Sequence, residues 1–233
     1  MEITVAFDRP DQAPTAGPVT VGWFLTSDKG AVLFDAPERL IFRQTNKAHA
    51  KSASRCPAVV QLESRYFVVN CPYDLHIGFS RDDKGKPHLI NRAGAASPVR
   101  ANKLNEVLTL VAENEWRYPD RPTVQLALPY CFIADELVYI TQLSAFMHYR
   151  KEQLPGTNFG GRFPVSIWPR PLMWAFEWHE PEKDLVLRRG EPLFYCQFEG
   201  AGPDRPVQLV EAERTPELQT YMDQIGGVVN YVN

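Results

Sequence analysis

The sequence lacks the short motifs that identify the commonest nucleophilic and phosphate-binding enzymes. It has no GxSxG nucleophile motif, and it has neither of the glycine-rich phosphate motifs, GxxxxGK[ST] and GxGxxG. No apolar run approaches the roughly 20 residues that span a bilayer, and an acid at position 2 stands where an apolar leader would begin. We therefore expect a soluble, cytoplasmic protein without a membrane segment.

Positive charge and cysteine are also scarce. Lys and Arg number 25 against 28 Asp and Glu, which gives a formal net charge of −3 at pH 7. No overall positive field would therefore attract nucleic acid or an anionic membrane. The four cysteines, Cys56, Cys71, Cys131 and Cys196, lie far apart in apolar or strand-like contexts and never form a CxxC pair. We expect them to be buried and reduced.

Glycine is outnumbered by proline, 14 against 20. Proline has no amide donor and a fixed φ, so this many prolines must lie in turns, at strand starts and along sheet edges. Long helices are therefore not expected. With 233 residues, 44% of them hydrophobic, the chain is long enough to bury a substantial core.

The strongest pattern present is the period-two alternation of apolar residues between positions 163 and 199. This run reads FPVSIWPRPLMWAFEWHEPEKDLVLRRGEPLFYCQFE and is interrupted by prolines and by a turn at 189–192. Such alternation is typical of antiparallel β structure. Because similar runs recur without βαβ alternation, we predict a mainly β (α+β) fold, an antiparallel sandwich or distorted barrel with one or two peripheral helices.

Shorter patterns predict the other strands and turns. Residues 3–7 indicate an opening strand, and residues 19–34 indicate two strands around a turn at 28–30. Residues 56–62 indicate another strand, and 81–86 is the clearest turn in the chain. We expect one compact domain over residues 1–233, with a sub-boundary, if there is one, near the Gly/Ala/Ser/Pro stretch at 93–98.

Two helices are expected. Leu104, Val107, Leu108 and Val111 stand at i, i+3, i+4 and i+7, which predicts one amphipathic helix over 100–113. A second helix is predicted over 216–225, because Thr215 is a good cap and Pro216 suits the first helical position.

Asp74 and His76 are the only candidate metal ligands that the local spacing suggests. They stand two apart on a predicted strand, so both side chains point to one face, as two ligands would need. The other four histidines have no fixed spacing from this pair. A solvent-facing or structurally bonded pair is the commoner arrangement, and the sequence leaves the cofactor unknown.

An aromatic and basic region supplies the candidate ligand-binding residues. Residues 174, 176 and 178 (Trp, Phe, Trp) share one strand face, which is either an inner sheet face or a stacking platform for sugars or bases. Core aromatics are the commoner case. Trp168, Arg162 and Arg170 flank this face, and if they were exposed together they would favour an anionic or planar ligand.

Two resemblances to known proteins follow from particular blocks. DLVLRRGEPLFYCQFE, residues 184–199, resembles the closing strands of β-clip proteins such as dUTPase, whose catalytic segments find no match in this sequence. The segments RCPAVVQLESRYFVVNCPYDL, RPLMWAFEW and LRRGEPLFYCQFE are similar to an uncharacterised family, a domain of unknown function, of bacteria and phages. This second likeness implies a phage or prophage context, and it brings no activity.

The sequence thus leaves three classes of function. The first is a non-catalytic binding or structural module of the cytosol. The alternative is a small-molecule enzyme of β-clip or double-stranded β-helix type that binds a metal or an anion. The third is a homo-oligomer, which the β-clip likeness and the apolar tail GGVVNYVN favour, because such a tail could pair with a neighbour's edge strand.

Overall fold

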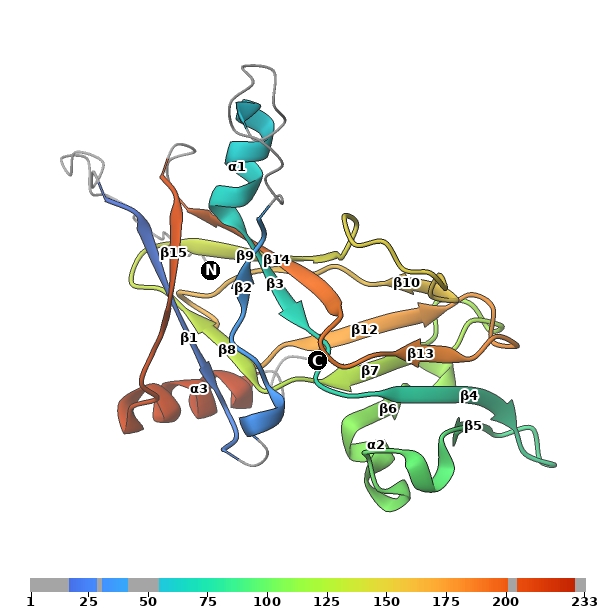
Figure 1. Cartoon of the computed structure of the whole chain (residues 1–233). Coiled ribbons are helices and arrows are strands. Elements are labelled where there is room, and N and C mark those ends of the chain that lie inside the picture. The colour runs from blue at the N-terminus through green and yellow to red at the C-terminus, as the bar shows by residue number, and fades with distance from the viewer. Residues whose placement is uncertain (1–16, 29–30, 42–54, 201–204, 229–233) are drawn as a thin grey trace.

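A computed structural model describes residues 17–28, 31–41, 55–200 and 205–228 of the chain. Within these ranges the protein is built from fifteen strands, arranged in four sheets, and three α-helices. None of these sheets closes into a barrel. The mainly β prediction is therefore confirmed in its sandwich form (Figure 1).

The largest sheet has five antiparallel strands in the order β11-β9-β14-β3-β2. Their bounds are Glu38–Arg39 (β2), Tyr66–Asn70 (β3), Val138–Ser144 (β9), Arg162–Pro164 (β11) and Pro192–Gly200 (β14). On β14, Phe194, Cys196 and Phe198 are fully buried, whereas Gln197 and Glu199 are half-buried on the opposite side. We call the side that carries Gln197 and Glu199 the open face of this sheet.

The second sheet has the antiparallel order β10-β12-β7-β6. Its strands are Leu108–Leu110 (β6), Thr123–Ala127 (β7), Gly156–Asn158 (β10) and Met173–Trp178 (β12). Trp174, Phe176 and Trp178 on β12 are fully buried, and the rings of the first two stack with centroids 5.0 Å apart. These aromatics form an inner sheet face and not an exposed stacking platform.

Two three-stranded sheets complete the fold. One has the order β15-β1-β8, with bounds Val19–Leu25 (β1), Tyr130–Ile133 (β8) and Val207–Glu211 (β15). The other has the order β13-β4-β5, with bounds Leu75–Arg81 (β4), Pro87–Asn91 (β5) and Leu185–Leu187 (β13). The β4–β5 connection is the predicted turn, where Gly85 takes a φ of +78°. β1 and β15 run parallel, so the sheets are not antiparallel throughout.

One continuous hydrophobic cluster draws side chains from all four sheets. Val19, Phe67, Leu75 and Val124 each come from a different sheet, and all belong to this cluster. Residues that precede and follow the stretch 93–98 therefore share a core. The stretch itself holds a short 3₁₀ turn, Gly94–Ala96, and the prediction of a single domain stays a prediction.

The helices differ from expectation in two places. Residues Pro57–Arg65 form helix α1, where a strand was predicted, and proline at its first turn suits a helix start. Helix α2 covers only Leu104–Val107, and the chain then enters β6, so the predicted long helix over 100–113 is wrong. Four apolar positions fit one helical turn followed by a short strand as well as they fit a longer helix.

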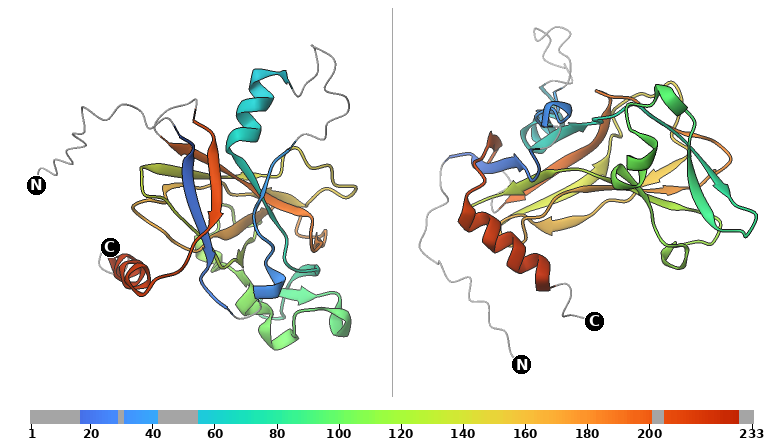
Figure 2. Two further views of the ribbon diagram at one scale, coloured as in Figure 1. Left: turned by 60° about the vertical axis from the view of Figure 1, so that its left-hand side comes forward. Right: turned by 90° about the horizontal axis from the view of Figure 1, so that it is seen from below.

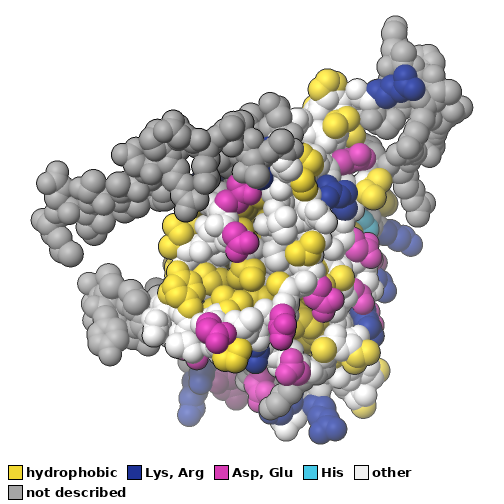
Figure 3. Space-filling view, turned by 90° about the vertical axis from the view of Figure 1, so that its left-hand side faces the viewer, with side chains coloured by type: hydrophobic (Ala, Val, Ile, Leu, Met, Phe, Trp, Pro, Cys, Tyr) yellow, Lys and Arg dark blue, Asp and Glu magenta, His cyan; other side chains and the backbone are white. Residues whose placement is uncertain are grey.

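Helix α3, Pro216–Val228, confirms the second predicted helix. The Thr215 hydroxyl accepts a hydrogen bond from the Leu218 amide at 3.2 Å, as a cap should. Helices α1 and α3 both lie outside the sheets (Figure 2). On the side that carries β1, β15 and α3, hydrophobic side chains gather in one area with carboxylates around it (Figure 3).

Three smaller expectations have mixed outcomes. Ala31–Leu33 form a 3₁₀ turn where the second strand after residues 28–30 was predicted. The predicted strand over 3–7 lies outside the described residues. Cys71, Cys131 and Cys196 are buried as expected, but Cys56 is exposed, because it occupies the N-cap position of a solvent-facing helix and does not lie in a strand.

No helix in the described ranges is long and apolar enough to cross a membrane.

Candidate functional site

Asp74 and His76 are exposed at the start of β4, and each contacts another part of the protein. His76 Nε2 lies 2.8 Å from Asp184 Oδ2, and Asp74 Oδ1 accepts a hydrogen bond from the Arg189 amide at 3.0 Å. Arg92 Nε also donates to Asp184, at 3.2 Å. Burial alone would raise the pKa of Asp184, but the hydrogen bonds from His76 and Arg92 outweigh it and lower that pKa.

This arrangement adds a carboxylate beside His76 but does not assemble a full set of ligands. No group of three or more His, Cys, Asp or Glu side chains within the described ranges is placed to hold a metal ion. The metal site at Asp74 and His76 therefore stays a prediction, without a third ligand from the described part of the chain.

Trp168 and Arg170 lie together, whereas Arg162 lies elsewhere. The Arg170 guanidinium carbon is 4.7 Å from the centroid of the Trp168 ring, and both residues line a pocket of about 560 Å³ beside α3. Arg162 lines a different and larger groove, of about 740 Å³. The structure thus divides the three predicted ligand-binding residues between two places.

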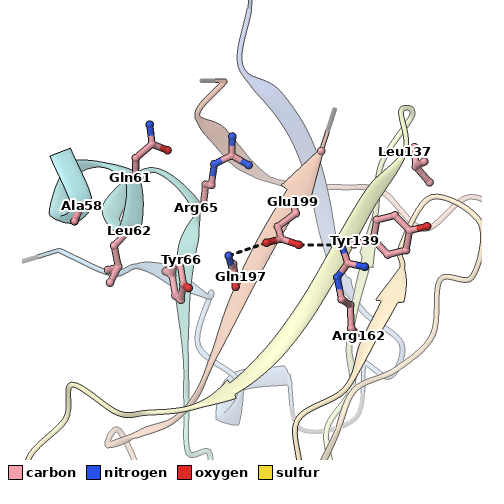
Figure 4. A pocket seen from close by; sticks show the side chains of 11 residues that line it. Ala58, Gln61, Leu62, Arg65, Tyr66, Leu137, Tyr139, Arg162, Gln197 and Glu199 are labelled. Atoms are coloured by element: carbon pink, nitrogen blue, oxygen red, sulfur yellow. Dashed lines mark hydrogen bonds and ion pairs between the residues drawn. The ribbon is translucent and has the colours of Figure 1, made fainter. Parts of the chain in front are cut away.

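The larger groove lies between α1 and the open face of the five-stranded sheet (Figure 4). Helix α1 forms one wall, and the neighbouring strands β3, β14, β9 and β11 supply the floor and the far wall. Its described lining consists of Ala58, Gln61, Leu62, Arg65, Tyr66, Leu137, Tyr139, Arg162, Gln197, Glu199 and Gly200. We call it the α1 groove.

Three planar polar side chains form a hydrogen-bonded row on the floor of the α1 groove. Glu199 Oε2 accepts a hydrogen bond from Arg162 Nη2 at 2.9 Å, and its Oε1 accepts one from Gln197 Nε2 at 3.0 Å. The Arg162 guanidinium also lies over the Tyr139 ring, with its carbon 4.1 Å from the centroid. These contacts hold the guanidinium, the carboxylate and the amide in defined orientations.

The wall on the α1 side adds a second arginine and a second tyrosine. Arg65 is 9% exposed, and its Nη2 donates to the backbone carbonyl of Arg205 at 3.2 Å. Tyr66 follows it at the start of β3, where burial and the charge of Glu199 raise the pKa of its hydroxyl. That hydroxyl therefore stays protonated at neutral pH and can both donate and accept a hydrogen bond.

The described lining of the α1 groove is rich in groups that bind a molecule by hydrogen bonds and ring contacts. Its described lining contains no serine, threonine, cysteine, histidine or aspartate, so a nucleophile with a histidine base cannot be assembled from it. It offers donors, acceptors and two aromatic rings in an open trough, which are the groups that fix the orientation of a bound molecule.

A polar cluster around the buried Glu177, near β10, has a different character. Glu177 is 4% exposed, and its Oε1 lies 2.9 Å from His179 Nε2 and 3.5 Å from Arg121 Nη1. Thr157 Oγ1 lies 3.2 Å from the same His179 nitrogen. A catalytic relay needs the hydroxyl and the carboxylate on opposite ring nitrogens, so this cluster is not a triad.

The sequence contained a signal for the α1 groove that was not used when strands were predicted from the alternation of apolar residues. Alternation along β14 places Phe194, Cys196 and Phe198 in the core, so Gln197 and Glu199 must share the other face. Gln197 and Glu199 are polar and lie next to each other on one face of the strand, whereas the residues on the opposite face are apolar. This pattern indicates that the face with the two polar residues is open to solvent. The helix that walls the groove could not be found this way, because residues 57–62 were predicted to be a strand.

Comparison with known proteins gives no relative. No family model matches the chain, and no curated protein and no solved structure is significantly similar to it. The likenesses to β-clip proteins and to an uncharacterised bacterial and phage family therefore stay predictions.

Proposed function

We propose that the protein is a non-catalytic binding module whose ligand lies in the α1 groove. The observation that carries this proposal is the row formed by Arg162, Glu199 and Gln197, which is held in place between two tyrosine rings. Binding to such a site costs less side-chain entropy, because the hydrogen bonds of the row already restrict these side chains. The volume of about 740 Å³ falls in the range of sites for small molecules.

The chain offers a matched pair of variants to test this site. Arg162 and Arg170 are both exposed arginines that stack on an aromatic ring, but only Arg162 lines the α1 groove. A ligand-observed NMR screen of a mixed library of neutral, anionic and cationic metabolites would identify bound compounds. We expect Arg162→Ala to weaken the binding of the hits by about tenfold or more, which is about 1.4 kcal/mol, and Arg170→Ala to leave it unchanged.

Other outcomes of this screen would reject the assignment. Hits that bind both variants equally, or that are lost only in Arg170→Ala, would show that the α1 groove is not the binding site. Hits lost in His76→Ala would favour the enzyme alternative, for which the contact between His76 and Asp184 is the structural argument.

The wider context rests on the sequence. We propose a cytoplasmic location and a phage or prophage origin as the setting of this module. A homo-oligomer stays a prediction, and most of the tail that motivated it, residues 229–233, lies outside the described residues.

A further inference from the structure

We propose that the α1 groove binds a neutral oligosaccharide, and this inference rests on the groove being the binding site. It is drawn from the juxtaposition of two tyrosine rings with three planar polar side chains across four neighbouring strands. Sugar rings present an apolar C–H face to an aromatic ring. Their hydroxyl groups, placed on neighbouring carbons, can pair with the two polar atoms of a guanidinium, carboxylate or amide.

The strand register places each ring directly beside a planar polar group. Tyr66 on β3 is opposite Gln197 on β14, and Glu199 on β14 is opposite Tyr139 on β9. Directly opposite residues have Cβ atoms about 5 Å apart, so one ligand unit can contact the Tyr66 ring and Gln197 together. The Arg162 guanidinium covers one face of the Tyr139 ring, so a sugar beside Glu199 would contact the guanidinium and the rest of that ring. Figure 4 shows these side chains along one line from α1 to Arg162.

The groove also suits a chain of such units. Its floor crosses successive strands, which are spaced about 4.8 Å apart, and the length of one sugar unit in an extended chain is close to this spacing. The trough is open to solvent and not an enclosed cavity, so a longer chain could extend beyond the strands that it contacts.

The charge of the floor argues against a strongly charged polymer. Glu199 is paired with Arg162, so the two charges at the centre cancel. An anionic chain would meet the carboxylate, and a cationic chain would meet the guanidinium. A nucleic acid needs a track of basic side chains along its backbone, and the described lining holds only Arg65 and Arg162.

An extended peptide is also less suited to this site. Peptides that add to a sheet use the free backbone groups of an edge strand. The α1 groove lies on the face of the sheet, where β14 pairs with β3 on one side and with β9 on the other. Recognition over these central strands must come from side chains, and only β11, at one end of the groove, is an edge strand.

The test uses the full chain and defined probes. Five neutral hexasaccharides (maltohexaose, cellohexaose, xylohexaose, mannohexaose and hexa-N-acetylchitohexaose) would be titrated beside a galacturonic acid hexamer, a glucosamine hexamer and a capped neutral hexapeptide. Isothermal titration calorimetry and saturation-transfer NMR would measure affinity. We expect at least one neutral hexasaccharide to bind, with an affinity that changes little with salt because no net charge is paired.

Variants then locate the bound sugar. Tyr139→Ala should weaken binding by about tenfold or more, whereas Tyr139→Phe, which keeps the ring, should stay within about threefold. Glu199→Gln keeps a planar group with an acceptor and should cost less than Arg162→Ala. Tyr149→Ala is the matched control, because Tyr149 is 82% exposed and lies outside the α1 groove. Circular dichroism would check that each variant is folded.

Each result has a distinct meaning. If a charged hexamer or the peptide binds, and the same variants weaken its binding, the sugar assignment is wrong but the α1 groove is still the binding site. If a neutral hexasaccharide binds to Tyr139→Ala and to Arg162→Ala as well as it binds to the unmodified protein, both the sugar assignment and the assignment of the binding site are wrong. If no hexasaccharide binds, the sugar assignment is wrong, and the metabolite screen with Arg162→Ala decides the site separately.

Discussion

Gly156 is a residue at which one added methyl group would disturb a strand pairing. A Cβ atom there would lie 2.0 Å from the carbonyl oxygen of Glu177 and 2.9 Å from Phe176 Cζ, on the facing strand β12. The carbonyl belongs to the backbone, so it cannot turn aside as a flexible side chain would. β10 would have to move away from β12.

We therefore expect Gly156→Ala to lower the free energy of unfolding by about 1–3 kcal/mol, the usual cost of overpacking. Gly161→Ala, in the connection that follows β10, is the control, because its Cβ would meet no atom within 4 Å. Urea denaturation of both variants measures the difference. Equal midpoints for the two would contradict the close approach of β10 and β12.

Single residues were predictable where one local rule applied. The buried faces of β12 and β14 followed from alternation, and the Gly85 turn followed from its composition. Which residues meet across the fold did not follow from any local rule. Arg162 and Arg170 are eight positions apart but line different cavities, because Arg162 lies on edge strand β11 and Arg170 lies in the segment that faces α3.

Two of the wrongly predicted elements show that it is easier to predict that a regular element exists than whether it is a helix or a strand. The two valines of residues 56–62 favoured a strand, but Pro57 starts a helix well, and the backbone amides of Val59 and Val60 donate to the Cys56 carbonyl. In residues 100–113, Leu108 and Leu110 alternate around the exposed Thr109 and pair with β7. Whether such a segment becomes a helix or a strand depends on whether a partner strand is available, and that depends on the fold of the whole chain.

Helix α3 gives a test at the scale of one element. Thr215→Ala removes the hydroxyl that caps the helix and should destabilise it by about 1 kcal/mol. Thr220, inside the helix, instead has its hydroxyl bonded to the Pro216 carbonyl at 2.9 Å, and alanine there should be neutral or slightly stabilising, because it is the better helix former.

Hydrogen exchange of the α3 amides would measure both effects. Faster exchange in Thr215→Ala together with unchanged or slower exchange in Thr220→Ala is the expected result. The opposite order would mean that the helix start is stabilised by something other than this cap.

The molecule as a whole should lose stability in alkali. Burial raises the pKa of Cys71 to about 11 and that of Cys131 to about 12, and it raises the pKa of Cys196 and Tyr130 as well. The unfolded chain releases its thiol protons first, near a pKa of 9.0, so the free energy of unfolding falls as the pH rises above that value. The fall is about 1.4 kcal/mol per pH unit for each buried thiol.

Urea denaturation between pH 8 and pH 11, with a reductant present, would measure this slope. Cys131→Ala is the control variant. It should reduce the pH dependence of the free energy of unfolding by the contribution of one thiol, whatever it does to stability at neutral pH. A free energy of unfolding that stays level up to pH 10 or higher would mean that the thiols are not buried.

The parallel pairing of β1 with β15 has a consequence for synthesis. Val19 lies opposite Val207, so β1 must wait for a partner strand that the ribosome makes much later. Until then, that edge of β1 is unpaired, and Val19 and Val21, which end up fully buried, are open to other nascent chains. Pairings this distant in sequence also slow folding. Overproduction should therefore be limited by the crowding of unfinished chains, and slower translation should improve the soluble yield.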